Sequence, residues 1–383
     1  MSRLDELIQM YCPNGVEYKK IRDITNYEQP SKYIVQSTNY SDDFQIPVLT
    51  AGQTFILGYT NENNGIFQAS KINPVIIFDD FTGSFKWVDF PFKVKSSAMK
   101  IITSNKEVLI RYLFHLMGFI NYSSDQHKRL WISKYSEIDV PVPPLEVQCE
   151  IVRILDNFTE LAAELAAELA ARKKQYEYYR DELLTFTNDT HLEKLKSIAK
   201  ISRGVRVTKS QLSDNNDYPV YQNALEPMGY HNEYNVLGGT TYVISAGAAG
   251  EIGFSEQNFW AADDCLVFTE LNGVINKYIY HFLMTKRDYI KSRVRKASIP
   301  RLSRDVIENI SIPIPSLDVQ KRIVNVLDNF EKICNDLNIG LPAEIEARQK
   351  QYEYYRDLLL TFTETGNIIE QTNKQTNKQA NKQ

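Results

Sequence analysis

Apolar residues recur at intervals of three and four from Val147 onward, which is the spacing of a coiled-coil seam. One extra four-residue step interrupts the alternation, as in a stutter. Three tandem Glu-Leu-Ala-Ala units, here called the ELAA array, fill residues 160–171, and no glycine or proline lies between residues 145 and 186. The pattern predicts a long spacer helix over residues 146–188, about 40 residues and ~60 Å in length.

A second apolar seam begins at Val319 and continues through Ile323, Val326 and Phe330. Gly340 and Pro342 interrupt it, because glycine loosens a helix and a proline ring clashes with the preceding turn. We therefore predict a second spacer helix over residues 318–363 that is broken near residues 340–342.

The two helical segments are copies of one another. Residues 147–158 (VQCEIVRILDNF) and 319–330 (VQKRIVNVLDNF) are identical at 8 of 12 positions, and residues 175–186 and 351–362 at 11 of 12. Residues 5–8 resemble residues 181–184, so a partial third copy stands at the start of the chain. The chain is a tandem duplication with a period of about 175 residues. Duplication favours a pseudo-two-fold, quasi-circular arrangement, in which two long antiparallel coiled-coil helices separate two domains.

Two segments that are less alike, residues 15–140 and 190–310, alternate with these helices. β-Branched runs at 73–79 and 240–246 predict buried strands. His115 and His281 stand at equivalent places in amphipathic stretches that predict helices, where packing or capping roles are favoured. We predict an α+β fold with two α/β domains in tandem, at residues 1–145 and 189–317, and a disordered polar tail at 364–383.

The overall composition is that of a globular protein, with 43% apolar and 24% charged residues among 383. No apolar run reaches the ~18 residues that a membrane span requires, and the first residues lack a continuous apolar segment, so we expect no secretory signal. The four cysteines lie far apart, without the spacing of a zinc ribbon or a disulfide framework. We therefore expect a cytoplasmic protein that does not contact membranes.

Charge is segregated, although the net charge is only −4. Eight basic residues lie between Lys286 and Arg304 against the single Asp288, and a similar basic stretch ends the first variable segment. Such stretches fit a polyanion whose phosphates lie close together, while the plain alternative is a solvated surface. The residues predicted to contact a nucleic acid are Lys93, Lys95, Lys128, Arg129, Arg203, Arg206, Lys209, Lys291, Arg293, Arg295, Lys296, Arg301 and Arg304.

Residue patterns that carry catalysis are missing. The five histidines show no metal-binding spacing such as H-E-x-x-H, and the glycine-rich segment 245–254 lacks the G-x-x-x-x-G-K-[ST] pattern of a nucleotide P-loop. We interpret that segment as a turn that lets the backbone approach a partner. The tyrosines at 176–179 and 352–355 have helical seam spacing, which favours packing between helices over base stacking. We predict no catalytic residue, no metal site and no cofactor in this chain.

Each half ends in the pattern P-x-P-[PS]-L-[ED]-V-Q followed by a long helix, at residues 141–148 and 313–320. Together with the tandem layout, this pattern closely resembles the specificity (S) subunit of type I restriction–modification enzymes. The resemblance covers residues 1–362, nearly the whole chain. The ELAA array resembles the short helical repeats between the halves of some such subunits. The break at Gly340 and Pro342 and the polar tail depart from the family pattern.

The resemblance implies that each variable domain is a target recognition domain, which reads one half of a bipartite, asymmetric sequence in double-stranded DNA. The helices would serve as spacers and as docking surfaces for two methylation subunits, and two restriction subunits would complete the enzyme. S-adenosylmethionine, ATP and Mg would belong to those partners, so this chain would be a non-catalytic DNA-recognition subunit. Residues of the docking and spacer helices are Gln148, Ile151, Leu155, Phe158, Leu161, Leu165, Leu169, Tyr176, Tyr179, Gln320, Ile323, Phe330, Tyr352 and Tyr355.

A coiled-coil scaffold with two protein-binding domains is the competing interpretation. It predicts association that is insensitive to nuclease and to salt, whereas specific DNA binding weakens steeply as salt rises. An enzyme that acts alone is disfavoured, because the catalytic motifs are absent from the sequence.

Overall fold

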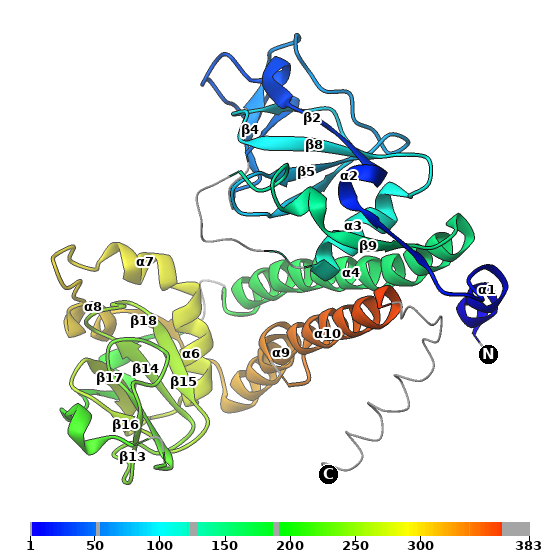
Figure 1. The fold of residues 1–383 in the computed structure, drawn as a ribbon. Coiled ribbons are helices and arrows are strands. Elements are labelled where there is room, and N and C mark those ends of the chain that lie inside the picture. The colour runs from blue at the N-terminus through cyan, green and yellow to red at the C-terminus, as the bar shows by residue number, and fades with distance from the viewer. Residues whose placement is uncertain are drawn as a thin grey trace. The chain divides into compact units, whose positions relative to one another are not determined.

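A computed structural model describes residues 2–50, 54–120, 122, 129–186, 191–213, 215–336 and 338–361 (Figure 1). The chain forms two compact units. Unit 1 combines the chain up to Glu164 with the described residues from Glu346 onward, and unit 2 spans Leu165–Ile345. No helix among the described residues is long and apolar enough to cross a membrane.

Unit 1 builds its variable domain from three small sheets, whose strand orders are β2-β8-β5-β6, β4-β3-β7 and β1-β9. Every neighbouring pair is antiparallel except β3 with β7. The elements are α1 (Arg3–Tyr11), β1 (Glu17–Lys20), α2 (Ile21–Ile24), β2 (Thr25–Glu28), η1 (Pro30–Tyr33), β3 (Ile46–Leu49), β4 (Ile56–Thr60), β5 (Val75–Asp79), β6 (Phe85–Val88), β7 (Lys93–Val94), β8 (Met99–Ser104), α3 (Ile110–Ile120), η2 (Tyr135–Glu137) and β9 (Asp139–Val142).

Unit 2 repeats this plan, with strand orders β11-β17-β14-β15, β13-β12-β16 and β10-β18. Here β12 and β16 form the parallel pair. The elements are β10 (Leu192–Lys194), α5 (Leu195–Ile198), β11 (Lys200–Arg203), η3 (Lys209–Gln211), β12 (Tyr218–Tyr221), β13 (Tyr230–His231), β14 (Thr240–Ile244), β15 (Ile252–Ser255), β16 (Trp260–Ala261), β17 (Cys265–Thr269), α6 (Asn276–Thr285), α7 (Arg287–Ser292), α8 (Arg304–Glu308) and β18 (Ser311–Pro313). The tandem α+β organisation predicted from the repeat is confirmed.

The central strands β5 and β14 are buried on both faces, which explains their continuous apolar runs. Ile76 and Phe78 face the core that α3 covers, while Val75 and Ile77 face a second core on the other side of the sheet. Alternate residues of a strand point to opposite faces, so one apolar run serves both cores.

The described residues also include three long helices: α4 (Leu145–Leu183), α9 (Leu317–Asn335) and α10 (Leu341–Leu360). In unit 1 the ring of Phe158 on α4 stacks on Tyr355 of α10, with centroids 5.0 Å apart. In unit 2 the ring of Tyr179 on α4 stacks on Phe330 of α9, with centroids 5.6 Å apart. Tyr179 and Tyr355 therefore pack between helices, as their spacing predicted, whereas the neighbouring Tyr178 and Tyr354 are exposed.

The second helical segment is interrupted between Asn335 and Leu341, just before the predicted Gly340–Pro342 position. A Cβ on Gly340 would lie 2.6 Å from the carbonyl oxygen of Asp336, so only glycine fits this turn. Pro342 is the second residue of α10, where its missing N–H has no intrahelical acceptor to lose. The proline thus starts a helix here instead of breaking one.

Candidate nucleic-acid interface

Several strands of unit 2 end at one edge of the β11-β17-β14-β15 sheet. The register pairs Arg203, the last residue of β11, with Leu266, and Ile244, the last residue of β14, with Cys265. The segments that follow β11 and β14 and precede β17 therefore meet at this edge, which we call the loop edge.

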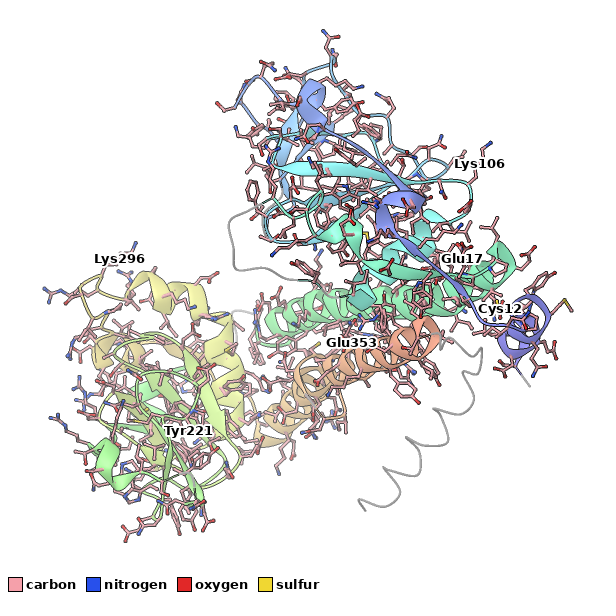
Figure 2. The ribbon with its side chains drawn as sticks, viewed as in Figure 1. Cys12, Glu17, Lys106, Tyr221, Lys296 and Glu353 are labelled. Atoms are coloured by element: carbon pink, nitrogen blue, oxygen red, sulfur yellow. The ribbon has the colours of Figure 1, made fainter. Side chains whose placement is uncertain are left out.

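A short basic hairpin, residues 295–301, lies on the loop edge. Arg295 and Arg301 form its bridging pair: the Arg295 N–H donates to the Arg301 carbonyl at 2.8 Å, and the reverse bond measures 3.2 Å. The Leu302 N–H donates to the carbonyl of Ser245 at 2.8 Å, which ties the hairpin to the turn after β14. Lys296 projects from the outer end of the hairpin (Figure 2).

The glycine-rich segment forms the turn between β14 and β15. Gly247 has a φ of +81°, and a Cβ there would lie 2.8 Å from both the Cβ and the carbonyl oxygen of Asn223. The Ala248 N–H donates to that carbonyl at 2.9 Å. Glycine was predicted to let the backbone approach a partner, and within the described residues that neighbour is the chain's own segment after β12.

Ion pairs divide the basic stretch into two groups. Lys291 and Arg287 bind Glu251 at 2.7 and 3.0 Å, and Arg304 binds Glu308 at 3.0 Å. Burial opposes ionisation of Glu251, but the hydrogen bond from Lys291 and the charge of Arg287 outweigh it and hold its pKa below the usual value. Lys291 and Arg304 are therefore already neutralised, which weakens the prediction that they contact DNA.

Arg295, Lys296 and Arg301 are exposed, and none has an acidic partner among the described residues. The guanidinium of Arg293 lies 5.1 Å from the centre of the Tyr289 ring. Like charges directly opposite each other on paired strands destabilise the pairing. The Arg295–Arg301 pair thus leaves uncompensated positive charge at the loop edge, a property suited to an anionic ligand.

The end of β11 and the segment after it carry the other predicted contacts of unit 2, Arg203, Arg206 and Lys209, and all three are exposed. The Gly204 N–H donates to the Cys265 carbonyl at 3.1 Å, and the Val205 N–H donates to the Ala261 carbonyl at 2.9 Å. The structure therefore brings Arg203 and Arg206 to the same loop edge as the basic hairpin, by way of β11 and β17.

Unit 1 holds an equivalent loop edge. The Leu130 N–H donates to the Asp80 carbonyl at 2.8 Å, just as Leu302 donates to Ser245 in unit 2. Arg129 consequently takes the place of Arg301, and it is exposed. The Asp80 carboxylate also accepts from the Trp131 N–H at 2.9 Å. Lys128, another predicted contact, lies outside the described residues.

Lys93 was predicted to contact DNA, but its side chain is buried and paired. Only 2% of it is exposed; its ammonium lies 3.0 Å from Glu62 and donates to the Asn64 carbonyl at 2.6 Å. A buried, paired ammonium cannot reach phosphate without losing both partners, which would leave the half-buried carboxylate of Glu62 without its cation. Lys95 is exposed beside Tyr40 and remains a predicted contact.

Several residues assigned to the docking and spacer helices are buried, and two of them bond to the variable domain of the same half. Gln148 and Gln320 are both fully buried. The Gln148 side chain accepts from the Leu109 N–H and donates to the carbonyls of Glu107 and Pro143. Gln320 does the same with Ile275, Gly273 and Pro315. The further buried members are Ile151, Leu155, Leu165, Tyr176 and Ile323. Burial of these side chains disfavours direct docking by them and fits the spacer part of the prediction.

The remaining members of that set keep partial exposure. Tyr179 and Tyr355 are each 37% exposed although their rings stack on neighbouring helices. The partly buried ones are Phe158, Leu161, Leu169, Phe330 and Tyr352.

The sequence pattern did not reveal the hydrogen-bond partners of His115 and His281. The Nε2 of His115 lies 2.8 Å from the Asp156 carboxylate and its Nδ1 lies 3.0 Å from the Tyr352 hydroxyl. His281 repeats this with Asp328 at 2.7 Å and Tyr176 at 3.5 Å. The aspartates within the repeated Leu-Asp-Asn-Phe segments were the available signal.

Burial and the neighbouring charges together set the pKa of His115. Burial lowers its pKa, and the neighbouring Asp156 only partly offsets this effect. Burial opposes ionisation of Asp156 as well, but His115 and Arg111 outweigh it, so the pKa of Asp156 also lies below its usual value. The lowered pKa favours the neutral imidazole of His115, which links three helices of unit 1 through Asp156 and Tyr352.

One set of groups has the chemistry of metal ligands. Ligand atoms of His281, Asp328 and Glu331 lie within 4.8 Å of one another. The ammonium of Lys277 lies 3.8 Å from both carboxylates, and the Tyr280 hydroxyl donates to Glu331 at 2.6 Å. These carboxylates therefore already have an internal cation and a donor.

The type I restriction modification DNA specificity domain model matches the chain twice, at residues 13–172 and 189–347. The chain belongs to this family. It is 40% identical to the specificity subunit of the type I restriction enzymes EcoR124I and EcoR124II of Escherichia coli, over 94% of this chain and 98% of that one. A specificity subunit of Haemophilus influenzae is 31% identical, over 91% of this chain and 96% of its own.

A solved structure shares the fold. The type I S subunit of M. genitalium superposes with a TM-score of 0.66 at 15% identity, covering 91% of this chain and 97% of that one. This chain is accordingly a type I specificity subunit with two tandem recognition domains, and the scaffold interpretation is not supported.

Proposed function

We propose that each recognition domain binds one half of a bipartite DNA sequence with its loop edge, and that the subunit itself catalyses no reaction. The Arg295–Arg301 pair carries this proposal, because it is exposed, lies at the meeting point of the strand ends, and has no acidic partner among the described residues. Arginine binds both phosphate and the guanine edge, so the pair suits either contact.

The proposed contacts in unit 2 are Arg203, Arg206, Lys209, Arg293, Arg295, Lys296 and Arg301, and in unit 1 Lys95 and Arg129. Methylation subunits, two per complex, would supply S-adenosylmethionine, and two restriction subunits would supply ATP- and Mg-dependent cleavage. The family supports these partners, since a type I system divides recognition from chemistry between subunits.

Mapping of methylated bases tests the function directly. In cells that carry the gene we expect one methylated motif with two defined halves and an unspecified gap, and deletion of the gene should remove that motif alone. A methylome that does not change on deletion would contradict the proposal.

The loop edge is tested with two matched double variants of the full chain. Arg295→Ala with Arg301→Ala should weaken DNA binding and lower the log–log salt slope by about 0.9 for each phosphate that the variant no longer binds. Lys291→Ala with Arg304→Ala removes the same charge from ion-paired positions and should change the slope little. Equal effects of the two pairs would show that overall charge, and not this hairpin, drives binding.

A further inference from the structure

An acidic turn lies on the basic loop edge of unit 2. Residues Ala262–Cys265 form this turn, in which the Cys265 N–H donates to the Ala262 carbonyl at 3.0 Å. Asp263 and Asp264 are its two central residues, and β17 begins directly after them, at the loop edge. Two carboxylates therefore stand on the same edge as the arginines that are proposed to bind DNA.

Separate segments of unit 2 hold this turn in place. The Gly204 N–H donates to the Cys265 carbonyl at 3.1 Å, and the N–H and hydroxyl of Ser245 both donate to the Asp264 carbonyl, at 2.7 and 2.8 Å. A Cβ on Gly204 would lie 2.5 Å from the carbonyl oxygen of Ala262, so the segment after β11 packs directly on the turn. The backbone of the turn is thus fixed before any ligand binds.

The Asp263 carboxylate has no hydrogen bond and no ion pair among the described residues, although Arg203, Arg206, Arg295 and Arg301 are exposed on the same edge. Asp263 is half-buried, and it is the only described aspartate with an oxygen, Oδ1, that is enclosed without a donor. An enclosed carboxylate oxygen without a donor costs free energy, so Asp263 does not stabilise the turn. Rotation about its soft χ2 bond can turn either oxygen toward a donor on a ligand.

The sign of the charge restricts what that ligand can be. A carboxylate repels phosphate, so on a DNA-binding edge its favourable partners are the amino groups of base edges. In the major groove these groups belong to cytosine and adenine, whereas guanine and thymine present acceptors. Adenine also places its acceptor N7 beside the amino group, and a carboxylate has no hydrogen to donate to N7. Cytosine presents its N4 amino group without such an acceptor, which makes it the better match.

We propose that Asp263 reads a cytosine in the half of the DNA target that unit 2 binds, by accepting a hydrogen bond from the N4 amino group in the major groove. This inference rests on the proposed function of the loop edge and adds a specificity-determining residue to it. The arginines hold the DNA, and the carboxylate between them excludes bases that present an acceptor.

Unit 1 has a different residue at the equivalent place. The Asp80 N–H donates to the Ala98 carbonyl at 3.2 Å, just as Ser245 donates to Asp264, so Ser97 takes the position of Asp263. A serine hydroxyl both donates and accepts and therefore does not select for an amino group. The two halves of the target should accordingly differ at the base that faces this turn.

The test maps methylated bases in strains that carry Asp263→Ala or Asp263→Asn in the complete enzyme. Replacing residues 189–317 with those of another specificity subunit identifies the half that unit 2 reads. In that half we expect one cytosine position at which Asp263→Ala lowers the preference over other bases by about fivefold or more. Asp263→Asn should admit adenine there, because an asparagine amide pairs with both N6 and N7. The other half and the gap should stay unchanged.

Asp217→Ala is the matched control, because Asp217 is an exposed aspartate before β12, and only the opposite end of β12 bonds to the turn, through the Tyr221 carbonyl. It should leave the motif unchanged. Urea unfolding should show Asp263→Asn to be as stable as the wild type, since the carboxylate has no partner to lose.

An unchanged motif in both Asp263 variants, a change at an A·T position, or a loss of stability in both variants would overturn the proposal. Loss of all methylation in both variants would overturn it as well, because a single base contact is not essential for binding. A wild-type strain without a bipartite motif would contradict the proposed function itself, whereas a wild-type motif that the Asp263 variants leave intact would contradict only the role of Asp263.

Discussion

Gln148 and Gln320 show how one side chain joins a helix to its recognition domain. Each amide accepts from a backbone N–H just before α3 or α6 and donates to two carbonyls, one of them in the lead-in to its own long helix. Glutamine offers an acceptor and two donors on one planar group, which matches these three partners. A buried position with three such partners tolerates no apolar replacement.

Gln320→Leu should destabilise unit 2 by about 2–4 kcal/mol, because a leucine of similar size leaves one N–H and two carbonyls buried without partners. Urea unfolding of the full chain measures this loss. Asn325→Leu, on an exposed position of the same helix, is the control and should change stability by less than about 0.5 kcal/mol. No loss of stability in Gln320→Leu would show that Gln320 only fills space.

His115 should make the stability of unit 1 depend on pH. Burial lowers its pKa, and the charges of Arg111 and Arg356 act in the same direction. The unfolded chain therefore binds a proton that the folded chain does not, so stability is full above the unfolded pKa of ~6.5 and falls as the pH drops below it. The lowered pKa of Asp156 acts separately, below the ordinary aspartate range.

His115→Gln should remove most of the loss of stability that the wild type shows between about pH 7.5 and pH 5.5. Tyr352→Phe retains the imidazole and should retain this loss while lowering stability at both pH values. Unfolding curves at the two pH values measure the effect. A wild-type and a His115→Gln chain with the same pH dependence would mean that another group titrates in this range.

At the scale of elements, the glycine-rich turn holds three segments of the loop edge together. Gly247→Ala places a methyl group 2.8 Å from Asn223 and also forces a residue with a side chain into a φ of +81°. We expect weaker DNA binding, because the turn must move and the basic hairpin bonded to Ser245 and Gly247 moves with it.

Gly239→Ala is the control for the strain. Gly239 has a φ of +74°, but a Cβ there meets nothing within 4 Å. This variant should lose about 1 kcal/mol of stability and keep its DNA affinity. Filter or anisotropy binding assays compare the two variants, and equal loss of DNA affinity would show that strain alone, without the clash at Asn223, disturbs the interface.

Elements were more predictable than the surfaces between them. Repeats and apolar spacing predicted the long helices and the buried strands β5 and β14, because those patterns depend on local geometry. The spacing did not predict which face of α4 packs against the recognition domain. Ile154 lies on the predicted seam, four and then three residues after Val147, yet the adjacent Leu155 is the fully buried residue. Likewise Lys93 belongs to a basic stretch, but its burial depends on Glu62, which is distant in the sequence.

At the scale of the whole molecule, each unit includes a helix that belongs to the other half of the repeat. Tyr352, from the second half, contacts His115 of the first, and Tyr176, from the helix of the first half, contacts His281 of the second. The repeat identifies which segments are alike but not which segments pack together. This exchange makes α4 a member of both units, held at Asp156 in unit 1 and at Tyr176 in unit 2.

The ELAA array lies on α4 between these two fixed points. Removal of one unit, Glu164–Ala167, shortens a helix by ~6 Å and turns its C-terminal part by about 40° beyond a full turn, so the packed face is nearly kept. DNA advances ~3.4 Å per base pair. We therefore predict that the deletion leaves both half-sequences unchanged and shortens the unspecified gap by at most about two base pairs.

Methylated-base mapping in strains with one unit deleted and with one unit inserted measures the gap in both directions. The insertion should lengthen the gap by the same amount. It also measures the gap in an active strain if the deletion strain is inactive because its shortened helix no longer accommodates the partner subunits. Glu164→Gln with Glu168→Gln, which keeps the length of α4, is the control and should leave the gap unchanged. The same gap in an active deletion or insertion strain would mean that the array is only a stable helical filler. A gap that follows the number of units would mean that the distance between Asp156 and Tyr176 sets the spacing of the DNA target.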